Sequence, residues 1–148
     1  MAESHKITTL MVYLTRVEHF NAAHKLFNPD WTDEQNYATF GKCSNPNWHG
    51  HNYELHVTVK GSPQPQTGYV FNAKILSDII KRDILDHVDH KNLNLDVPFM
   101  QGLHTSAENL CMCIFNILKE SLSNFPEVIL HSVKLYETPR IYVEYFGE

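Results

Sequence analysis

The sequence predicts an α+β domain in which two helices pack on one face of a four-stranded antiparallel sheet. Three observations support this prediction. β-Branched and aromatic residues form two strand-like runs within the first 60 residues, residues 72–122 contain apolar residues at helical spacing, and two strand-like runs close the chain. The order is therefore β-β-α-α-β-β, and strands grouped at both ends of a chain favour antiparallel pairing.

The first strand is expected over residues 7–20, and the small residues of 21–24 continue or end it. The polar segment 28–48 is too long for a plain connector. Thr32 and Gln35 fit a capping box, so part of this segment is expected to be helical and the remainder to be a functional loop.

Residues 49–60 alternate in polarity and predict the second strand. Asn72 is expected to cap a helix that runs to about residue 88. Thr105 and Glu108 fit a second capping box, which opens a helix to about residue 122. The closing strands are expected over residues 128–137 and 141–146.

Length and composition predict one domain over residues 1–148, with 43% hydrophobic and 20% charged residues. The net charge of −5 gives no general attraction to nucleic acid or to anionic lipid. No apolar run is long enough to span a membrane, and three cysteines give no disulfide framework. The start of the chain lacks the pattern of a signal peptide, so we expect a cytoplasmic protein.

Histidine is abundant, at ten residues, and His49 and His51 are the most informative pair. Residues i and i+2 of a strand point to the same side, with Cα atoms roughly 6–7 Å apart, so both imidazoles can hold one metal ion. His24, at the end of the neighbouring strand, is the best candidate for a third ligand. Spacing alone does not choose it over His19 or His56, although His56 falls on the opposite strand face. Three histidines with an open position are typical of catalytic zinc.

Three further features suggest reactive groups. Cys43 precedes His49 on a loop, where it suits a base or nucleophile or, alternatively, a fourth zinc ligand. Asp89 and His90 form an acid–imidazole pair after a helix, which suits proton transfer, although helix ends also favour histidine for dipole reasons. Glu137 shares a strand face with apolar residues, so it needs a partner, which is either a ligand with paired N–H groups or solvent.

Together these segments resemble the 6-pyruvoyl tetrahydropterin synthase family over nearly the whole chain. The resemblance covers the family's first histidine motif, its cysteine and paired-histidine signature, its Asp-His segment and its two pterin-anchoring segments. These correspond to residues 20–24, 40–53, 85–93, 106–109 and 135–138.

The resemblance implies the tunnelling fold (T-fold), in which the sheets of several subunits join into a barrel. It implies a homohexamer, a dimer of trimers, with active sites between subunits. The implied reaction is a lyase step that converts 7,8-dihydroneopterin triphosphate to 6-pyruvoyl tetrahydropterin and triphosphate, in tetrahydrobiopterin biosynthesis. The family uses one Zn²⁺ per subunit and also depends on Mg²⁺.

The resemblance also implies roles for individual residues. The implied metal ligands are His24, His49 and His51; the implied catalytic residues are Cys43, Asp89, His90 and Glu137; the implied substrate-binding residues are Glu137, Glu108 and Ser106. Trp48 stands where the family usually has a small residue. The alternatives are a 6-carboxytetrahydropterin synthase-type lyase, whose cysteine typically lies closer to the paired histidines, and a non-catalytic zinc-binding protein.

Overall fold

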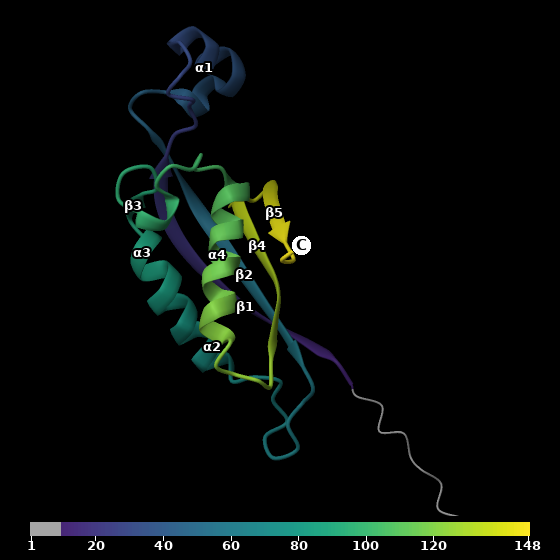
Figure 1. The fold of residues 1–148 in the computed structure, drawn as a ribbon. Helices are drawn as coiled ribbons and strands as arrows, with labels where there is room; N and C mark the ends of the chain where they lie inside the picture. Colours follow the sequence, from purple (N-terminus) through teal and green to yellow (C-terminus); the bar gives the residue numbers. More distant parts are fainter. Residues whose placement is uncertain (1–9) are drawn as a thin grey trace, which may run out of the picture.

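The structure is a computed structural model that describes residues 10–148, and it is built around one five-stranded sheet (Figure 1). The strands lie in the order β3-β1-β2-β4-β5. Their bounds are β1 Val12–His24, β2 His49–Gly61, β3 Lys91–Asn92, β4 Ile129–Thr138 and β5 Ile141–Tyr145. The α+β class is thus confirmed, and the four predicted strands are present; residues 7–9 of the first prediction lie outside the described part.

The prediction of four antiparallel strands misses β3. This strand pairs with β1 in parallel through two residues, at Ala22–Lys91 and Ala23–Asn92, whereas β1–β2, β2–β4 and β4–β5 are antiparallel. A two-residue strand carries no periodicity, so nothing in residues 89–104 signals it. The sheet is therefore mixed, and β3 covers only the last part of the outer edge of β1.

The helical layer lies on one face of the sheet, and α1 stands apart from it at one end of the molecule (Figure 1). The predicted helix after Asn72 is a continuous run whose middle part is a π-helix, and short 3₁₀ helices occur in two loops. The bounds are α1 Asp33–Phe40, η1 Gly41–Ser44, α2 Ala73–Ile80, η2 Lys81–Leu85, α3 Asp86–Val88, η3 Pro98–Met100 and α4 Ala107–Leu122. Apolar side chains of α2 and α4 pack with β2 and β4 to form the core.

Two of the three predicted helix starts are confirmed. Thr32 and Gln35 form the expected capping box of α1, and the Asn72 side chain accepts hydrogen bonds from Lys74 N and Ile75 N. The predicted capping box at Thr105 is wrong, because Ser106 is the N-cap of α4 and accepts from Asn109 N. The Thr105 side chain is buried and bonds elsewhere, which matters for the site below.

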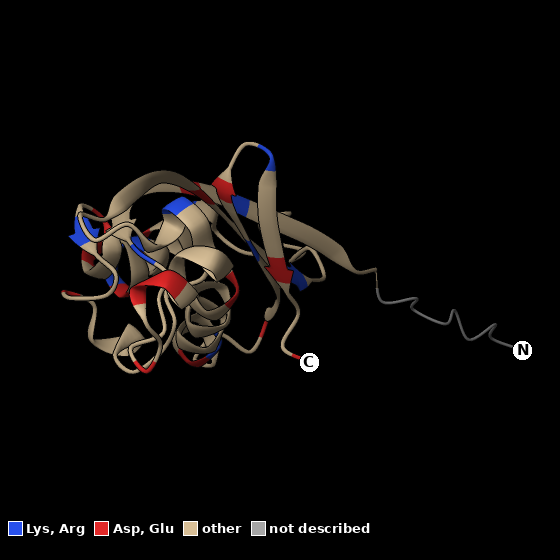
Figure 2. Cartoon of the chain, turned by 90° about the horizontal axis from the view of Figure 1, so that it is seen from above, with Lys and Arg blue, Asp and Glu red and all other residues tan. Residues whose placement is uncertain are grey.

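The β1–β2 register determines which side chains face the helices. Phe20 lies opposite Tyr53 and their rings stack, with centroids 4.7 Å apart, and four residues further on His24 lies opposite His49. The end of this core-facing row is therefore occupied by histidines. Figure 2 shows basic and acidic segments interspersed along the chain. Within residues 10–148, no helix has both the length and the apolar character that crossing a bilayer requires.

Candidate metal centre and active site

Three histidines from two adjacent strands converge at the end of the sheet. His24 ends β1, and His49 and His51 begin β2, on the core-facing side. Their ring centroids are 4.5 Å apart for His24–His49, 5.1 Å for His24–His51 and 5.0 Å for His49–His51. One ligand atom from each residue lies within 4.8 Å of the other two. The structure therefore selects His24 as the partner of the paired histidines.

The nitrogens of these rings are arranged to receive a metal ion. His24 Nδ1 lies 2.7 Å from the carbonyl oxygen of Thr105. Because a carbonyl only accepts, Nδ1 carries the proton and Nε2 keeps its lone pair. His24 Nε2 and both ring nitrogens of His49 are buried without a hydrogen-bond partner in residues 10–148. Unpartnered buried nitrogens are costly unless a ligand satisfies them, so this donor set fits a metal such as zinc.

Burial favours the neutral, metal-binding form of two of the three histidines, His24 and His49. Removal from water lowers the pKa of His24 to about 4, although the hydrogen bond to Thr105 raises it and the neighbouring His49 and His51 lower it further. Burial also lowers the pKa of His49, with His51 contributing. Because metal binds the neutral imidazole, His24 and His49 do not have to release a proton near neutral pH before they bind it.

The other candidates lie outside this group. His56 Nε2 is 2.9 Å from Glu54 Oε2, on the opposite face of β2, and His19 Nε2 is 3.9 Å from Glu54 Oε1. Cys43 lies in η1 and is not part of the three-histidine ligand group. Its carbonyl accepts a hydrogen bond of 2.8 Å from Leu26 N, which anchors the cysteine loop two residues beyond His24.

Trp48, directly before His49, has a backbone conformation that favours glycine. Its φ is +70°, in the left-handed region. The Lys25 ammonium lies 4.6 Å from the centroid of the Trp48 ring and 4.6 Å from that of Phe27, so cation–π contacts hold the large side chain in place. This explains how tryptophan is accommodated where the resemblance leads us to expect a small residue.

Glu137 lies beside the metal-binding histidines. Its Oε1 is 3.2 Å from His51 Nε2, and both side chains are largely buried. The contact lacks hydrogen-bond geometry, since His51 Nε2 has no hydrogen-bond partner in residues 10–148. Tyr53 is fully buried next to His51. Its burial is the main reason that the pKa of its phenol is raised, and the negative charge of Glu137 raises this pKa further. The strand pattern left both a ligand and solvent open as the partner of Glu137, and the structure places its largely buried carboxylate beside His51.

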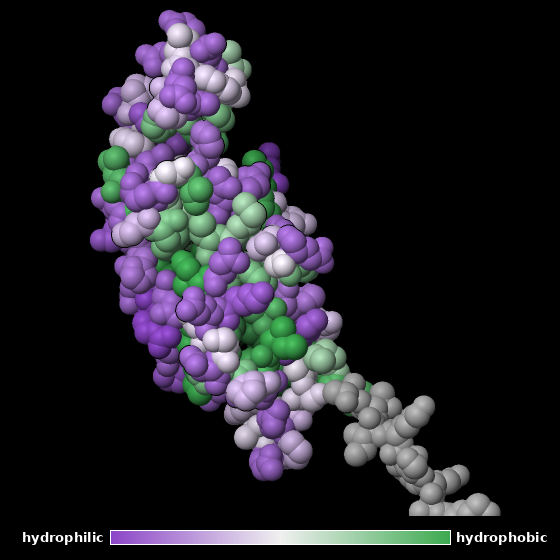
Figure 3. Space-filling model, in the orientation of Figure 1, coloured by the Kyte–Doolittle hydropathy of each residue, from purple (hydrophilic) through white to green (hydrophobic). Residues whose placement is uncertain are grey.

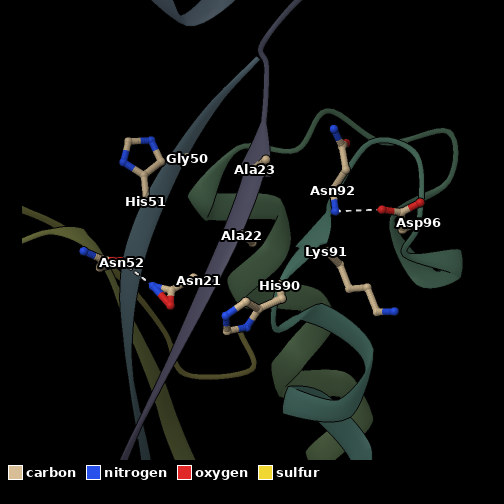
Figure 4. Close-up of a pocket in the computed structure, with 10 residues that line it drawn as sticks. All are labelled: Asn21, Ala22, Ala23, Gly50, His51, Asn52, His90, Lys91, Asn92 and Asp96. Atoms are coloured by element: carbon tan, nitrogen blue, oxygen red, sulfur yellow. Dashed lines mark hydrogen bonds between the residues drawn. The ribbon is translucent and has the colours of Figure 1, made fainter. Parts of the chain in front are cut away.

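Asp89 and His90 form a pair, but at the outer edge of β1. Asp89 Oδ1 lies 3.0 Å from His90 Nδ1 and accepts a 2.9 Å hydrogen bond from Asn21 N, which is the main reason that the pKa of Asp89 is lowered. Figure 4 shows His90 and His51 on different sides of the β1–β2 pair. Both line a cavity of about 600 Å³. The structure thus confirms the Asp89–His90 contact, and the cavity that His90 lines extends to His51, although the pair makes no direct contact with the three histidines within residues 10–148.

The start of α4 borders the metal centre through its backbone. Ser106 caps the helix, Glu108 is exposed in its first turn, and the preceding Thr105 contacts His24. Sequence reasoning did not find the role of Thr105, because the Thr105–Glu108 pair looked like a capping box. It also missed Asn94, which contacts Thr105; no sequence signal connects a loop asparagine to a distant strand end.

Comparison with known proteins accounts for this combination of fold and site. The family model described as 6-pyruvoyl tetrahydropterin synthase matches residues 13–148. The chain belongs to the 6-pyruvoyl tetrahydropterin synthase family. A relative from Pongo abelii, named 6-pyruvoyl tetrahydrobiopterin synthase, is 43% identical over 129 residues, which cover 87% of each chain. The solved 6-pyruvoyl tetrahydropterin synthase of Caenorhabditis elegans superposes with a TM-score of 0.87 at 37% identity, covering 95% of this chain and 98% of that one.

A second branch of 6-pyruvoyl tetrahydropterin synthase relatives is more distant. The 6-carboxy-5,6,7,8-tetrahydropterin synthase of Haemophilus influenzae is 31% identical over 71% of this chain and 84% of its own. Five residues separate Cys43 from His49 here, the longer spacing expected of the pyruvoyl branch. Membership of the synthase family therefore identifies the chain as a lyase and confirms the α+β T-fold that the resemblance implied.

Proposed function

We propose that this protein is a zinc-dependent lyase that converts 7,8-dihydroneopterin triphosphate to 6-pyruvoyl tetrahydropterin and triphosphate, in tetrahydrobiopterin biosynthesis. The observation that carries the proposal is the group of three histidines, one buried and two partly buried, whose ring nitrogens include unpartnered buried ones and which lie beside Glu137, in a chain of this family. Three ligands leave a coordination position for substrate, which favours a catalytic over a purely structural site.

Each residue has a distinct proposed task. His24, His49 and His51 hold the metal, which when bound supplies Lewis-acid stabilisation of negative charge on the side-chain oxygens of the substrate. Cys43 is the base that accepts the proton from the substrate side chain. Asp89 and His90 relay protons; the carboxylate orients the imidazole across the 3.0 Å contact.

The pterin end of the substrate is assigned to Glu137, Glu108 and Ser106. A carboxylate accepts two N–H bonds side by side, as the amino group and ring N–H of a pterin require. The position of Glu137 next to His51 supports this role, since it brings the pterin-binding group to the metal centre. Ser106 is the N-cap of α4 and Glu108 lies in its first turn, and both closely follow Thr105, whose carbonyl contacts His24.

We further propose that the active sites lie between subunits of a homohexamer, a dimer of trimers with a barrel built from the joined sheets. Asp89 and His90 lie at the β3 edge of the sheet, whereas the histidine ligands face the helices. We place the sheet edge of a second copy against this edge, so that residues of both copies complete the active site. Mg²⁺ is proposed as an activating ion that acts with the triphosphate.

Product analysis after incubation with 7,8-dihydroneopterin triphosphate tests the function. A 6-pyruvoyl product with release of triphosphate is expected. A 6-carboxy product would instead assign the chain to the alternative lyase branch, and the absence of turnover by zinc-loaded protein would favour a non-catalytic zinc-binding protein.

Cys43→Ala tests the proposed base separately from the metal site. We expect one zinc per chain to be retained and turnover to fall by about 10²–10⁴-fold, because a general base contributes on that scale. Metal content and initial rate are the measurements. Cys113→Ala, at a half-buried cysteine of α4, is the matched control and should keep both. Loss of zinc from Cys43→Ala would make Cys43 a ligand.

A further inference from the structure

The Thr105 carbonyl is the group that sets the metal-binding nitrogen of His24. It accepts from His24 Nδ1 at 2.7 Å, so Nε2 faces the metal position. Both residues are about 1% exposed, and the ring cannot turn to another acceptor without losing this bond. Every residue type has a backbone carbonyl, so the side chain at position 105 matters here only through the contacts that hold this backbone in place.

The Thr105 side chain is held by a small polar network. Its Oγ1 lies 3.0 Å from Asn94 Oδ1 and 3.3 Å from the Lys25 carbonyl oxygen, so its single proton is shared between two acceptors. The Asn94 side chain in turn makes two hydrogen bonds to the Lys25 backbone. Lys25 N donates to Asn94 Oδ1 at 3.1 Å, and Asn94 Nδ2 donates to the Lys25 carbonyl oxygen at 3.2 Å.

This network joins three separate segments at one point. Lys25 directly follows the metal ligand His24, Asn94 lies in the loop after β3, and Thr105 directly precedes the N-cap of α4. The Asn94 side-chain amide bonds to the backbone of Lys25, two residues beyond Ala23, where the pairing of β1 with β3 ends, so it takes the place of a strand partner there. The chain on both sides of the His24–Thr105 bond is therefore fixed.

We propose that Asn94 and Thr105 are positioning residues of the metal centre, which lock the His24 tautomer and ring orientation through the Thr105 carbonyl. The inference rests on the proposed metal centre but not on turnover. Outer partners of metal-binding histidines typically contribute about 10–100-fold to metal affinity. The network predicts that removing the Thr105 hydroxyl weakens metal binding although no ligand is altered.

The test measures metal affinity and ligand geometry without substrate. Zn²⁺ affinity is determined by competition with a chromophoric chelator, and geometry is determined from the visible absorption spectrum of the Co²⁺-loaded protein. For Thr105→Val we expect affinity to fall about 10–100-fold and the Co²⁺ bands to change, whereas Thr105→Ser, which keeps the hydroxyl, stays near the wild type. Thr15→Val is the matched control, because Thr15 bonds to Thr58 in the exposed part of the sheet.

Asn94→Ala is the second test variant, and it tests the positioning role of the network if Thr105→Val does not fold. It leaves Thr105 intact but removes both bonds to the Lys25 backbone, so it should weaken Zn²⁺ binding in the same direction. Zn²⁺ affinity within about twofold of the wild type in the folded variants, with unchanged Co²⁺ bands, would overturn the proposal. An equal loss in Thr15→Val would also overturn it. If the tight metal site is intact but turnover is absent, the proposed reaction fails and this inference stands.

Discussion

His24 illustrates how a single buried residue combines fold and function. It occupies the last position of a core-facing row in which Phe20 and Ala22 precede it, and it is as buried as they are. Its polar atoms are satisfied on one side by Thr105 and left free on the other. The same desolvation that makes the residue expensive to bury keeps it neutral and ready to bind metal.

The low pKa of His24 predicts acid sensitivity of the metal-free protein. In the unfolded chain the imidazole takes up a proton near pH 6.5, but in the fold it does so only near pH 4. Protonation therefore favours the unfolded chain between these values, and stability falls as pH decreases from about 6.5 to 4. The expected loss from pH 7 to pH 5 is about 2 kcal/mol.

Urea unfolding of chelator-treated protein at pH 7 and pH 5 measures this effect. His24→Asn, which retains a donor toward Thr105, should show a loss smaller by about 2 kcal/mol. His104→Asn, at an exposed position, should behave as the wild type. Equal pH dependence in the wild type and His24→Asn would remove His24 as the cause.

At the level of elements, β1 and the helical run from Ala73 to Val88 position the site. β1 carries His24 to the end of the sheet, and the helical run brings Asp89 back to the Asn21 backbone at the outer edge of β1. The π-helical turn at Lys81–Leu85 lies within this run. The cap that starts the run therefore contributes to the placement of the Asp89–His90 pair.

Asn72→Ala removes this cap. Asn72 Oδ1 accepts from Lys74 N at 2.9 Å and from Ile75 N at 3.3 Å, and both donors would lose their partner. We expect the free energy of unfolding to fall by about 1 kcal/mol, as measured by urea denaturation. Asn72→Asp preserves the acceptor and should remain within a few tenths of the wild type. A loss as large for Asp as for Ala would contradict the capping role.

At the scale of the whole molecule, the outer edge of β1 is largely unpaired and the neighbouring surface exposes apolar side chains. Within residues 10–148, the β3 side of β1 is paired only at Ala22 and Ala23. Several apolar residues near the start of β1 and on β5 are exposed, namely Leu10, Met11, Val12, Tyr13, Ile141 and Tyr142. Figure 3 shows hydrophobic patches interrupting the hydrophilic surface of the helix-bearing face. Exposed strand edges with apolar side chains invite pairing with another copy.

Assembly predicts a particle about six times the mass of the chain, by light scattering or sedimentation. Val12→Lys, in the part of β1 whose outer edge is unpaired, should shift the protein to smaller species, because it places charge in the proposed sheet-to-sheet contact. Ile75→Lys, on the outer surface of α2, is the control and should leave the mass unchanged. A monomeric wild type would refute the hexamer.

The sequence alone determined the strand and helix order, the paired histidines and the family, because these depend on local periodicity, on short spacings and on motifs. Strand alternation placed His49 and His51 on one face, and the Asn72 and Thr32 caps were readable from adjacent residues. The tertiary structure decided the rest. It selected His24 over His19 and His56, brought Glu137 to His51, added β3, and turned Thr105 from an expected cap into the group that orients a metal ligand. Each of these depends on contacts between segments far apart in the chain, for which local sequence carries no signal.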